Sequence, residues 1–133
     1  MAGTDCGFSQ SPLAGRVHRS IMWAKPKCLA SFEAANPRHE HEWKVWKDVT
    51  LRAGKVMMPG LIAHSTNVVE HPDLVAERLL RYADIVGRDS VMAGTDCGFS
   101  QSPLAGRVHR SIMWAKLKCL AEGAAIVSKL LWH

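Results

Sequence analysis

Near the carboxyl end of the chain, apolar residues recur at spacings of three and four. The positions are Met113, Leu117, Leu120, Ala124, Val127 and Leu131. In a helix with 3.6 residues per turn, this spacing puts apolar side chains on one face. The pattern therefore predicts a long amphipathic helix over about residues 108–131.

A second amphipathic segment lies earlier in the chain. Pro72 suits the first turn of a helix, and Asp73 is favoured at the positive end of the helix dipole. Gly87 is suited to end the helix, because glycine accepts the backbone angles needed there. The apolar face between these ends consists of Val75, Leu79, Tyr82 and Val86.

Short apolar runs between the amphipathic segments predict strands. The first is Ser31-Phe32-Glu33, which is followed by the turn signal Asn36-Pro37. The second covers residues 55–62 and contains Pro59-Gly60, and the third covers residues 90–93. A short helix that buries tryptophan is expected over residues 39–49.

The predicted order is strand, helix, strand, helix, strand, helix. This order indicates an α/β protein with a parallel sheet, in which the carboxyl ends of the strands share one edge. Glu33 ends the first of these strands, and His64 and Cys97 follow the other two. We therefore expect a carboxylate, an imidazole and a thiol to converge there.

The cysteines and the His-Glu repeat also have purely structural interpretations. Cys97 stands in an Asp-Cys-Gly turn, where a small buried cysteine is common. His39 and His41 alternate with Glu40 and Glu42, but residues two apart on a helix point away from each other, so a solvated helix start is the better interpretation. Cys119 lies within the last helical pattern and is expected to be a packed thiol.

The chain contains a partial duplication. Residues 1–30 repeat residues 92–121 with one difference, Pro26 in place of Leu117. Proline inside a helix costs about 3 kcal/mol, so we expect residues 1–30 to be poorly ordered or a broken helix. Residues 31–133 then form the structured part.

Composition and charge narrow the function classes. Hydrophobic residues make up 47% of the chain and charged residues 22%, as in an ordinary globular protein. The net charge of +5 arises largely from residues 1–30, which carry four basic residues and one acid. No clustered basic stripe with aromatic residues is visible, so nucleic acid is a weak candidate partner.

The four cysteines are two residues copied, Cys6 with Cys97 and Cys28 with Cys119. They form neither a disulfide framework nor a Cys-x-x-Cys pair, which is typical of a reducing compartment. No apolar run approaches the roughly 18 residues of a membrane span. We expect a soluble, cytoplasmic chain that does not bind membranes.

Several motifs together resemble the C-terminal catalytic region of the cobalamin-independent methionine synthase family. They cover residues 31–133 in order. The motifs are Ser31-Phe32-Glu33-Ala34-Ala35-Asn36-Pro37-Arg38-His39-Glu40-His41-Glu42-Trp43, Pro59-Gly60, His64-Ser65, Asn67-Val68, Glu70-His71-Pro72 and Ala93-Gly94-Thr95-Asp96-Cys97-Gly98-Phe99.

The resemblance implies a (β/α)8 (TIM) barrel, of which this chain would hold about three βα units. It implies a zinc ion held by a His-x-Cys pair, a glutamate and a late cysteine; the last two match Glu33 and Cys97. His64 matches the histidine that donates a proton. The implied reaction transfers a methyl group from methyltetrahydrofolate polyglutamate to the thiol of homocysteine, and related members alkylate coenzyme M.

One departure from the family pattern is that no His-x-Cys pair occurs in this sequence. Cys6 precedes Glu33 but lacks the accompanying histidine. We therefore expect a methyltransferase that is incomplete in this chain. The alternatives are a related alkyl transferase acting on another thiol, and a non-catalytic module that self-associates through open sheet edges.

Overall fold

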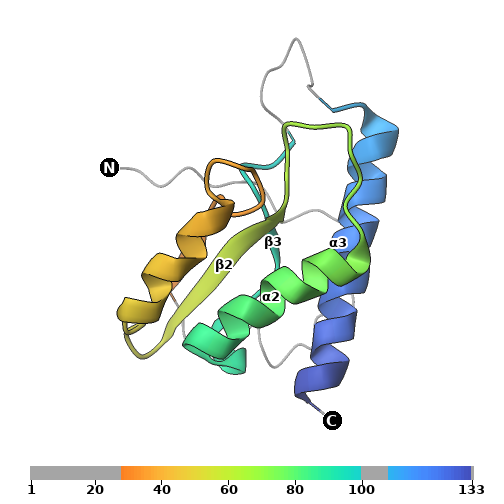
Figure 1. The fold of residues 1–133 in the computed structure, drawn as a ribbon. Helices are drawn as coiled ribbons and strands as arrows, with labels where there is room; N and C mark the ends of the chain where they lie inside the picture. The colour runs from red at the N-terminus through yellow and green to blue at the C-terminus, as the bar shows by residue number, and fades with distance from the viewer. Residues whose placement is uncertain (1–27, 100–107, 133) are drawn as a thin grey trace.

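The computed structural model describes residues 28–99 and 108–132 (Figure 1). It contains a parallel sheet in the order β1-β2-β3. The strands are β1 (Cys28–Phe32), β2 (Lys55–Ile62) and β3 (Gly94–Thr95). The predicted α/β class with a parallel sheet is confirmed, and these strands are compatible with part of a TIM barrel.

Helical segments follow each strand, as the sequence predicts. The 3-10 helix η2 (Glu40–Asp48) connects β1 to β2. The α-helix α2 (Pro72–Val86) and the short 3-10 helix η3 (Arg88–Ser90) connect β2 to β3, and α3 (Arg110–Leu131) follows β3. In the part of the chain that the structure describes, no helix combines the length and apolar character needed to cross a membrane.

The central strand β2 is paired on both sides. Its first half pairs with β1, from Cys28 opposite Lys55 to Phe32 opposite Pro59. Its second half pairs with β3, and the register there is irregular between Gly60 and Ile62. Because all three strands run in the same direction, their carboxyl ends lie at one edge, which is at the top of Figure 1.

The core lies between the sheet and the helices. Met57, Leu61 and Ile62 of β2 are fully buried, as is Val75 of α2. The Phe32 ring contacts Trp46 of η2 and Tyr82 of α2, with ring centroids 5.1 and 5.8 Å apart. Trp43 and Trp46 are only partly buried, so the expected burial of tryptophan by this helix is incomplete.

The buried face of α3 differs from the predicted one. Leu120 and Val127 are buried as expected, but the remaining buried positions are Lys116, Cys119 and Gly123. Gly123 faces α2 so closely that a Cβ atom there would lie 2.6 Å from the Cβ of Val75. Close packing of α3 on α2 therefore decides which α3 residues are buried, with the two helices side by side in Figure 1.

Two expected element bounds are wrong. A strand over residues 90–93 is replaced by η3, a single bridge from Val91 to Met57, and the two-residue β3. β1 begins at Cys28, so residues 28–30 of the duplicated segment are extended rather than helical. Pairing with β2 holds them in this conformation. The remainder of that segment, residues 1–27, lies outside the described residues.

Candidate metal centre

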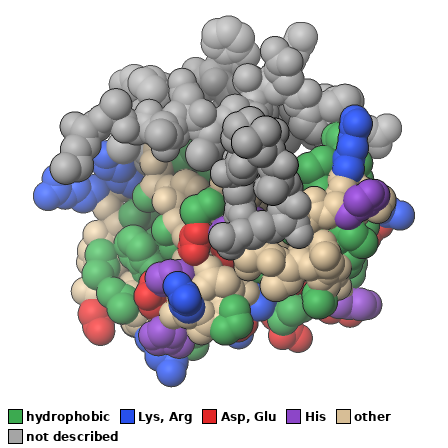
Figure 2. Space-filling view, turned by 90° about the horizontal axis from the view of Figure 1, so that it is seen from above, with side chains coloured by type: hydrophobic (Ala, Val, Ile, Leu, Met, Phe, Trp, Pro, Cys, Tyr) green, Lys and Arg blue, Asp and Glu red, His purple; other side chains and the backbone are tan. Residues whose placement is uncertain are grey.

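The carboxyl edge of the sheet gathers the three candidate side chains. Glu33 directly follows β1, His64 follows β2, and Cys97 follows β3. One ligand atom from each residue lies within 4.8 Å of the other two. The expected convergence is confirmed, whereas the roles assigned to these residues stay predictions. Figure 2 looks onto this edge and shows acidic, histidine and basic side chains close together there.

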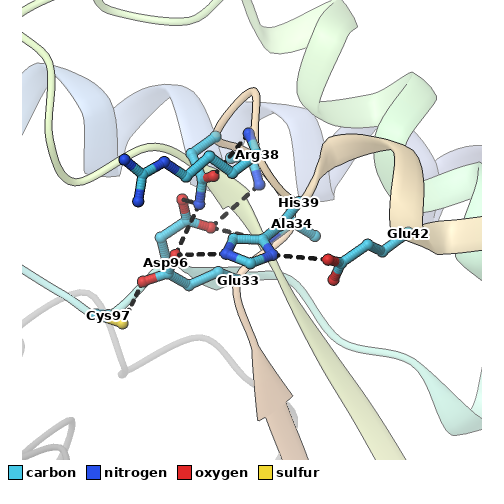
Figure 3. Close-up of polar contacts among 9 residues, drawn as sticks. Glu33, Ala34, Arg38, His39, Glu42, Asp96 and Cys97 are labelled. Atoms are coloured by element: carbon cyan, nitrogen blue, oxygen red, sulfur yellow. Dashed lines mark hydrogen bonds and ion pairs between the residues drawn. The ribbon is translucent and has the colours of Figure 1, made fainter.

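The thiol of Cys97 and the carboxylate of Glu33 are in direct contact. The sulfur Sγ donates a hydrogen bond to Glu33 Oε1 at 2.5 Å (Figure 3). This hydrogen bond is the main reason why the pKa of the Glu33 carboxyl is lowered; burial opposes it, and the charge of nearby His64 adds to it. Glu33 is therefore an ionised carboxylate beside a thiol at neutral pH.

The imidazole of His64 lacks a hydrogen-bond partner on one side. Its Nδ1 atom is buried and makes no hydrogen bond with any of the described residues. A buried polar atom without a partner costs about 1–3 kcal/mol, so such atoms are normally completed by a protein group, an ordered water or a bound group. His64 belongs to the same three-residue cluster as Glu33 and Cys97.

Asp96 joins the loops that carry Glu33 and Cys97. Its Oδ1 atom accepts hydrogen bonds from the backbone N–H groups of Ala34 and Ala35, at 3.0 and 3.1 Å. Its Oδ2 atom accepts from the Asn36 side-chain amide at 3.3 Å, and the same amide donates to Glu33 Oε2 at 2.7 Å (Figure 3). The buried Asp96 carboxylate thus orients Glu33 through both backbone and side chain.

Gly60 makes room for this arrangement. A Cβ atom at Gly60 would lie 2.7 Å from the backbone nitrogen of Asp96 and would collide with its carboxylate. The backbone N–H of Asp96 donates a hydrogen bond to the backbone carbonyl oxygen of Ile62 in β2, at 3.1 Å. Glycine is therefore required here for β2 and the Asp96 turn to approach each other.

A buried ion pair holds the loop that bears His64. Glu70 accepts a hydrogen bond from the backbone N–H of Ala63 at 2.8 Å, and Lys116 Nζ contacts its other carboxylate oxygen at 2.7 Å. The Lys116 side chain is 0% exposed. Cys119 donates to the Glu70 backbone carbonyl, and burial raises the pKa of its thiol, so the expected packed thiol is confirmed.

His39 lies closer to the site than the sequence indicated. Its Nδ1 atom contacts Glu42 at 2.9 Å, and its Nε2 atom lies 3.9 Å from Glu33 Oε2. The hydrogen bond to Glu42 is the main reason why the pKa of His39 is raised. The expected solvated helix start is correct for exposed His41, but it missed the contact of His39 with Glu33.

A cavity opens beside these groups. It has a volume of about 500 Å³, and its wall includes Glu33 and His64 from the cluster and the cationic side chain of Arg38. The space is polar and open to solvent on one side. A small molecule entering it would meet the imidazole and the carboxylate directly.

The donor set fits a zinc ion. Zinc is held in proteins by thiolate sulfur, imidazole nitrogen and carboxylate oxygen, and catalytic zinc sites use three protein ligands with one position open. Here one donor of each kind is present, and the imidazole offers a buried nitrogen with no partner among the described residues. Binding of zinc to the sulfur would release the thiol proton with which Cys97 now donates a hydrogen bond to Glu33.

Comparison with known proteins gives a structural relationship. No protein-family model matches the chain, and no curated protein sequence matches it. Among solved structures, the chain is similar to a B12-independent methionine synthase from Shewanella sp. W3-18-1 in complex with selenomethionine. The TM-score is 0.65 and the sequence identity 26%.

The similarity is extensive for this chain and partial for the synthase. It covers 79% of this chain and 28% of that enzyme. The chain thus spans less than a third of the length of the synthase that it matches. The match supports a methyltransferase-like relationship at the level of the fold, in agreement with the resemblance in the motifs.

Proposed function

We propose that the carboxyl edge of the sheet is a zinc-binding, thiol-activating site of a methyltransferase related to the B12-independent methionine synthases. The observation that carries this proposal is the convergence of Glu33, His64 and Cys97, whose ligand atoms lie within 4.8 Å of one another. These residues come from three successive strand ends. Each of the three strand ends carries a residue type that binds zinc in proteins.

The chemistry of the site suits a thiol substrate. A free thiol has a pKa of about 8.5 and is mostly protonated at neutral pH, whereas zinc, when bound, stabilises the thiolate. Glu33 and Cys97 would hold the metal and supply two negative charges. Arg38 and His39 in the cavity wall would offset the further negative charge of an incoming thiolate.

The proposed reaction is methyl transfer to homocysteine from 5-methyltetrahydropteroyl-glutamate. A carbon–sulfur bond forms as the bond between the methyl carbon and the folate N5 breaks, and N5 takes up a proton. We propose that this chain contributes only part of the enzyme, because the three strands formed by the described residues do not close an eight-stranded barrel. The substrate pockets would be completed by further polypeptide.

Zinc binding by the full chain provides the first test. We expect equilibrium dialysis followed by metal analysis to find one zinc per chain. Cys97→Ser should abolish tight binding, because hydroxyl oxygen is a poor zinc ligand. Cys6→Ser is the matched control, since it changes the same residue in the first copy of the repeat, and it should leave binding intact. Equal zinc binding by both variants would contradict the proposed site.

Thiol binding provides the second test. The chain loaded with Co²⁺ should change its visible absorption when homocysteine is added, because a thiolate sulfur becomes a ligand. Coenzyme M is added in a separate experiment. It tests whether the site binds the thiol used by the related alkyl transferases. Failure of both thiols to change the spectrum would overturn thiol activation. Absence of metal binding with a concentration-dependent molecular size would favour the self-associating module instead.

A further inference from the structure

The geometry points to a different role for His64 from the one that the family resemblance implies. We infer that His64 binds the metal directly, as the third protein ligand, and does not act as the proton donor. This inference rests on the proposed zinc site. It gives the chain a Glu-His-Cys ligand set in place of the His-x-Cys pair that its sequence lacks.

The position of the imidazole is the first argument. One of its ring nitrogens lies within 4.8 Å of both the Cys97 sulfur and a Glu33 oxygen. Donor atoms that lie this close together can share one metal ion. Glu33 and His64 also line the cavity, so a small molecule entering it would reach a metal held by these residues.

The unpartnered nitrogen is the second argument. His64 Nδ1 is buried and lacks a hydrogen-bond partner among the described residues. A proton donor would keep its reactive nitrogen at the cavity, with the opposite nitrogen held by an acceptor that fixes the tautomer. Such an acceptor is not seen in the described part of the chain. A metal ion satisfies a buried imidazole nitrogen without any acceptor.

The support behind the loop is the third argument. Ala63, the residue before His64, is held by the Glu70 carboxylate, and Glu70 is in turn paired with the buried amine of Lys116. A loop anchored by a buried ion pair holds its side chain in one place. Metal ligands need this fixed position, because their affinity depends on all donors being in place before binding.

The ligand set has consequences for charge. A metal-bound imidazole is neutral and has no proton on the ligating nitrogen, so that nitrogen has none to donate. Zinc with one thiolate and one carboxylate is formally uncharged, whereas the family set with a second thiolate would carry one negative charge. The neutral site repels an incoming thiolate less. It should therefore bind thiols as thiolates at a lower pH.

Metal titration of matched histidine variants tests the inference. Wild-type chain, His64→Gln and His41→Gln are titrated with Co²⁺, and zinc affinity is measured by competition. His41 is exposed on η2 and serves as the control. We expect His64→Gln to lose at least about 100-fold in zinc affinity, because even the loss of an outer-shell partner costs 10–100-fold. His41→Gln should bind as the wild type does.

His64→Gln could lose zinc affinity simply because it unfolds. A rescue variant and a direct spectroscopic measurement separate this effect from the loss of a metal ligand. His64→Cys should recover zinc binding and add a second thiolate band to the cobalt spectrum, whereas a purely structural histidine would not be replaced in this way. In the wild-type chain, zinc should shift the ¹⁵N resonance of one His64 ring nitrogen to the range of a coordinated imidazole.

The outcomes separate this inference from the proposed function. Tight zinc binding that His64→Gln leaves unchanged, or a His64 ring resonance that zinc does not move, would overturn the ligand role and leave the zinc site standing on Glu33 and Cys97. A wild-type chain that binds no zinc would overturn both proposals. Loss of affinity in His64→Gln alone, with recovery in His64→Cys, supports the Glu-His-Cys site.

Discussion

The same tripeptide, Cys-Leu-Ala, is a strand in one part of this molecule and a helix in another. Residues 28–30 form the start of β1, whereas residues 119–121 lie in the middle of α3. The leucine of the strand copy, Leu29, is 47% exposed, and its helical counterpart, Leu120, is 7% exposed. Identical residues therefore differ in both conformation and burial.

The surroundings of each copy explain the difference. Pro26 precedes the strand copy, and proline disfavours a helix running through it; the helical copy has Leu117 at that position. Ser31-Phe32 follows the strand copy, where the aromatic residue favours a strand. Pairing with β2 then holds residues 28–30 extended, while packing on α2 holds α3. Local propensity is a weak influence that tertiary contacts confirm or override.

The largest expected effect comes from making the two copies identical. Leu117→Pro removes a backbone donor within α3 and should lower the free energy of unfolding by about 3 kcal/mol or more. Helical circular dichroism should fall, and thermal unfolding should shift to lower temperature. The reciprocal Pro26→Leu should leave both signals nearly unchanged, because pairing with β2 determines β1. An increase in helix content in Pro26→Leu would show that local sequence dominates.

The two copies of Asp-Cys offer the next test. Asp96→Ala leaves the backbone N–H groups of Ala34 and Ala35 without their buried acceptor, which should cost about 2–4 kcal/mol. Zinc binding should weaken as well, because Glu33 loses its orientation. Asp5→Ala makes the same change in the first copy and should alter neither unfolding nor zinc affinity. Equal effects of both substitutions in chemical denaturation would contradict this account.

The close contact between α3 and α2 should be weakened by the addition of a single methyl group at Gly123. Gly123→Ala places a Cβ atom 2.6 Å from Val75 and should destabilise the chain by about 1–3 kcal/mol, although alanine is the better helix former. Ser128→Ala is the matched control on the exposed side of α3 and should be neutral or slightly stabilising. Urea unfolding measures both; a stable Gly123→Ala would mean that the helices separate without cost.

The smallest expected effect concerns the thiol of the helical copy. Burial raises the pKa of Cys119, so the unfolded chain loses this proton before the folded chain does. Stability should therefore decline as pH rises above the unfolded thiol pKa of about 8.5, by under about 1 kcal/mol near pH 9. Urea unfolding at pH 7.5 and 9 should show this decline in the wild type and a smaller one in Cys119→Ala. An equal decline in both chains would assign it to other groups.

Tyr82 reinforces this trend at higher pH. Burial raises the pKa of its phenol to about 12, so the folded state keeps the proton that the unfolded state releases near pH 10. Its contribution begins above the range of the thiol test. The two groups can therefore be separated by the pH at which stability falls.

The candidate site could be predicted only in part. Glu33, His64 and Cys97 follow predicted strands, and a parallel sheet brings such positions together whatever the details of packing. The contact of His39 with Glu33 and the bonds from Asp96 to Ala34 and Ala35 join residues that depend on how the loops fold. The Asn36-Pro37 turn was visible in the sequence, but the hydrogen bond from Asn36 to Asp96 was not.

The sequence alone determined the alternation of strands and helices, because hydrophobic spacing, Pro72 and Gly87 act within a few residues. Only the tertiary structure decided which face of α3 is buried, where β1 begins and how short β3 is. Those features depend on the approach of Gly123 to Val75 and on pairing with β2, between residues distant in the chain. Free energies of such contacts exceed local propensities, which amount to less than about 1 kcal/mol per residue for most residue types.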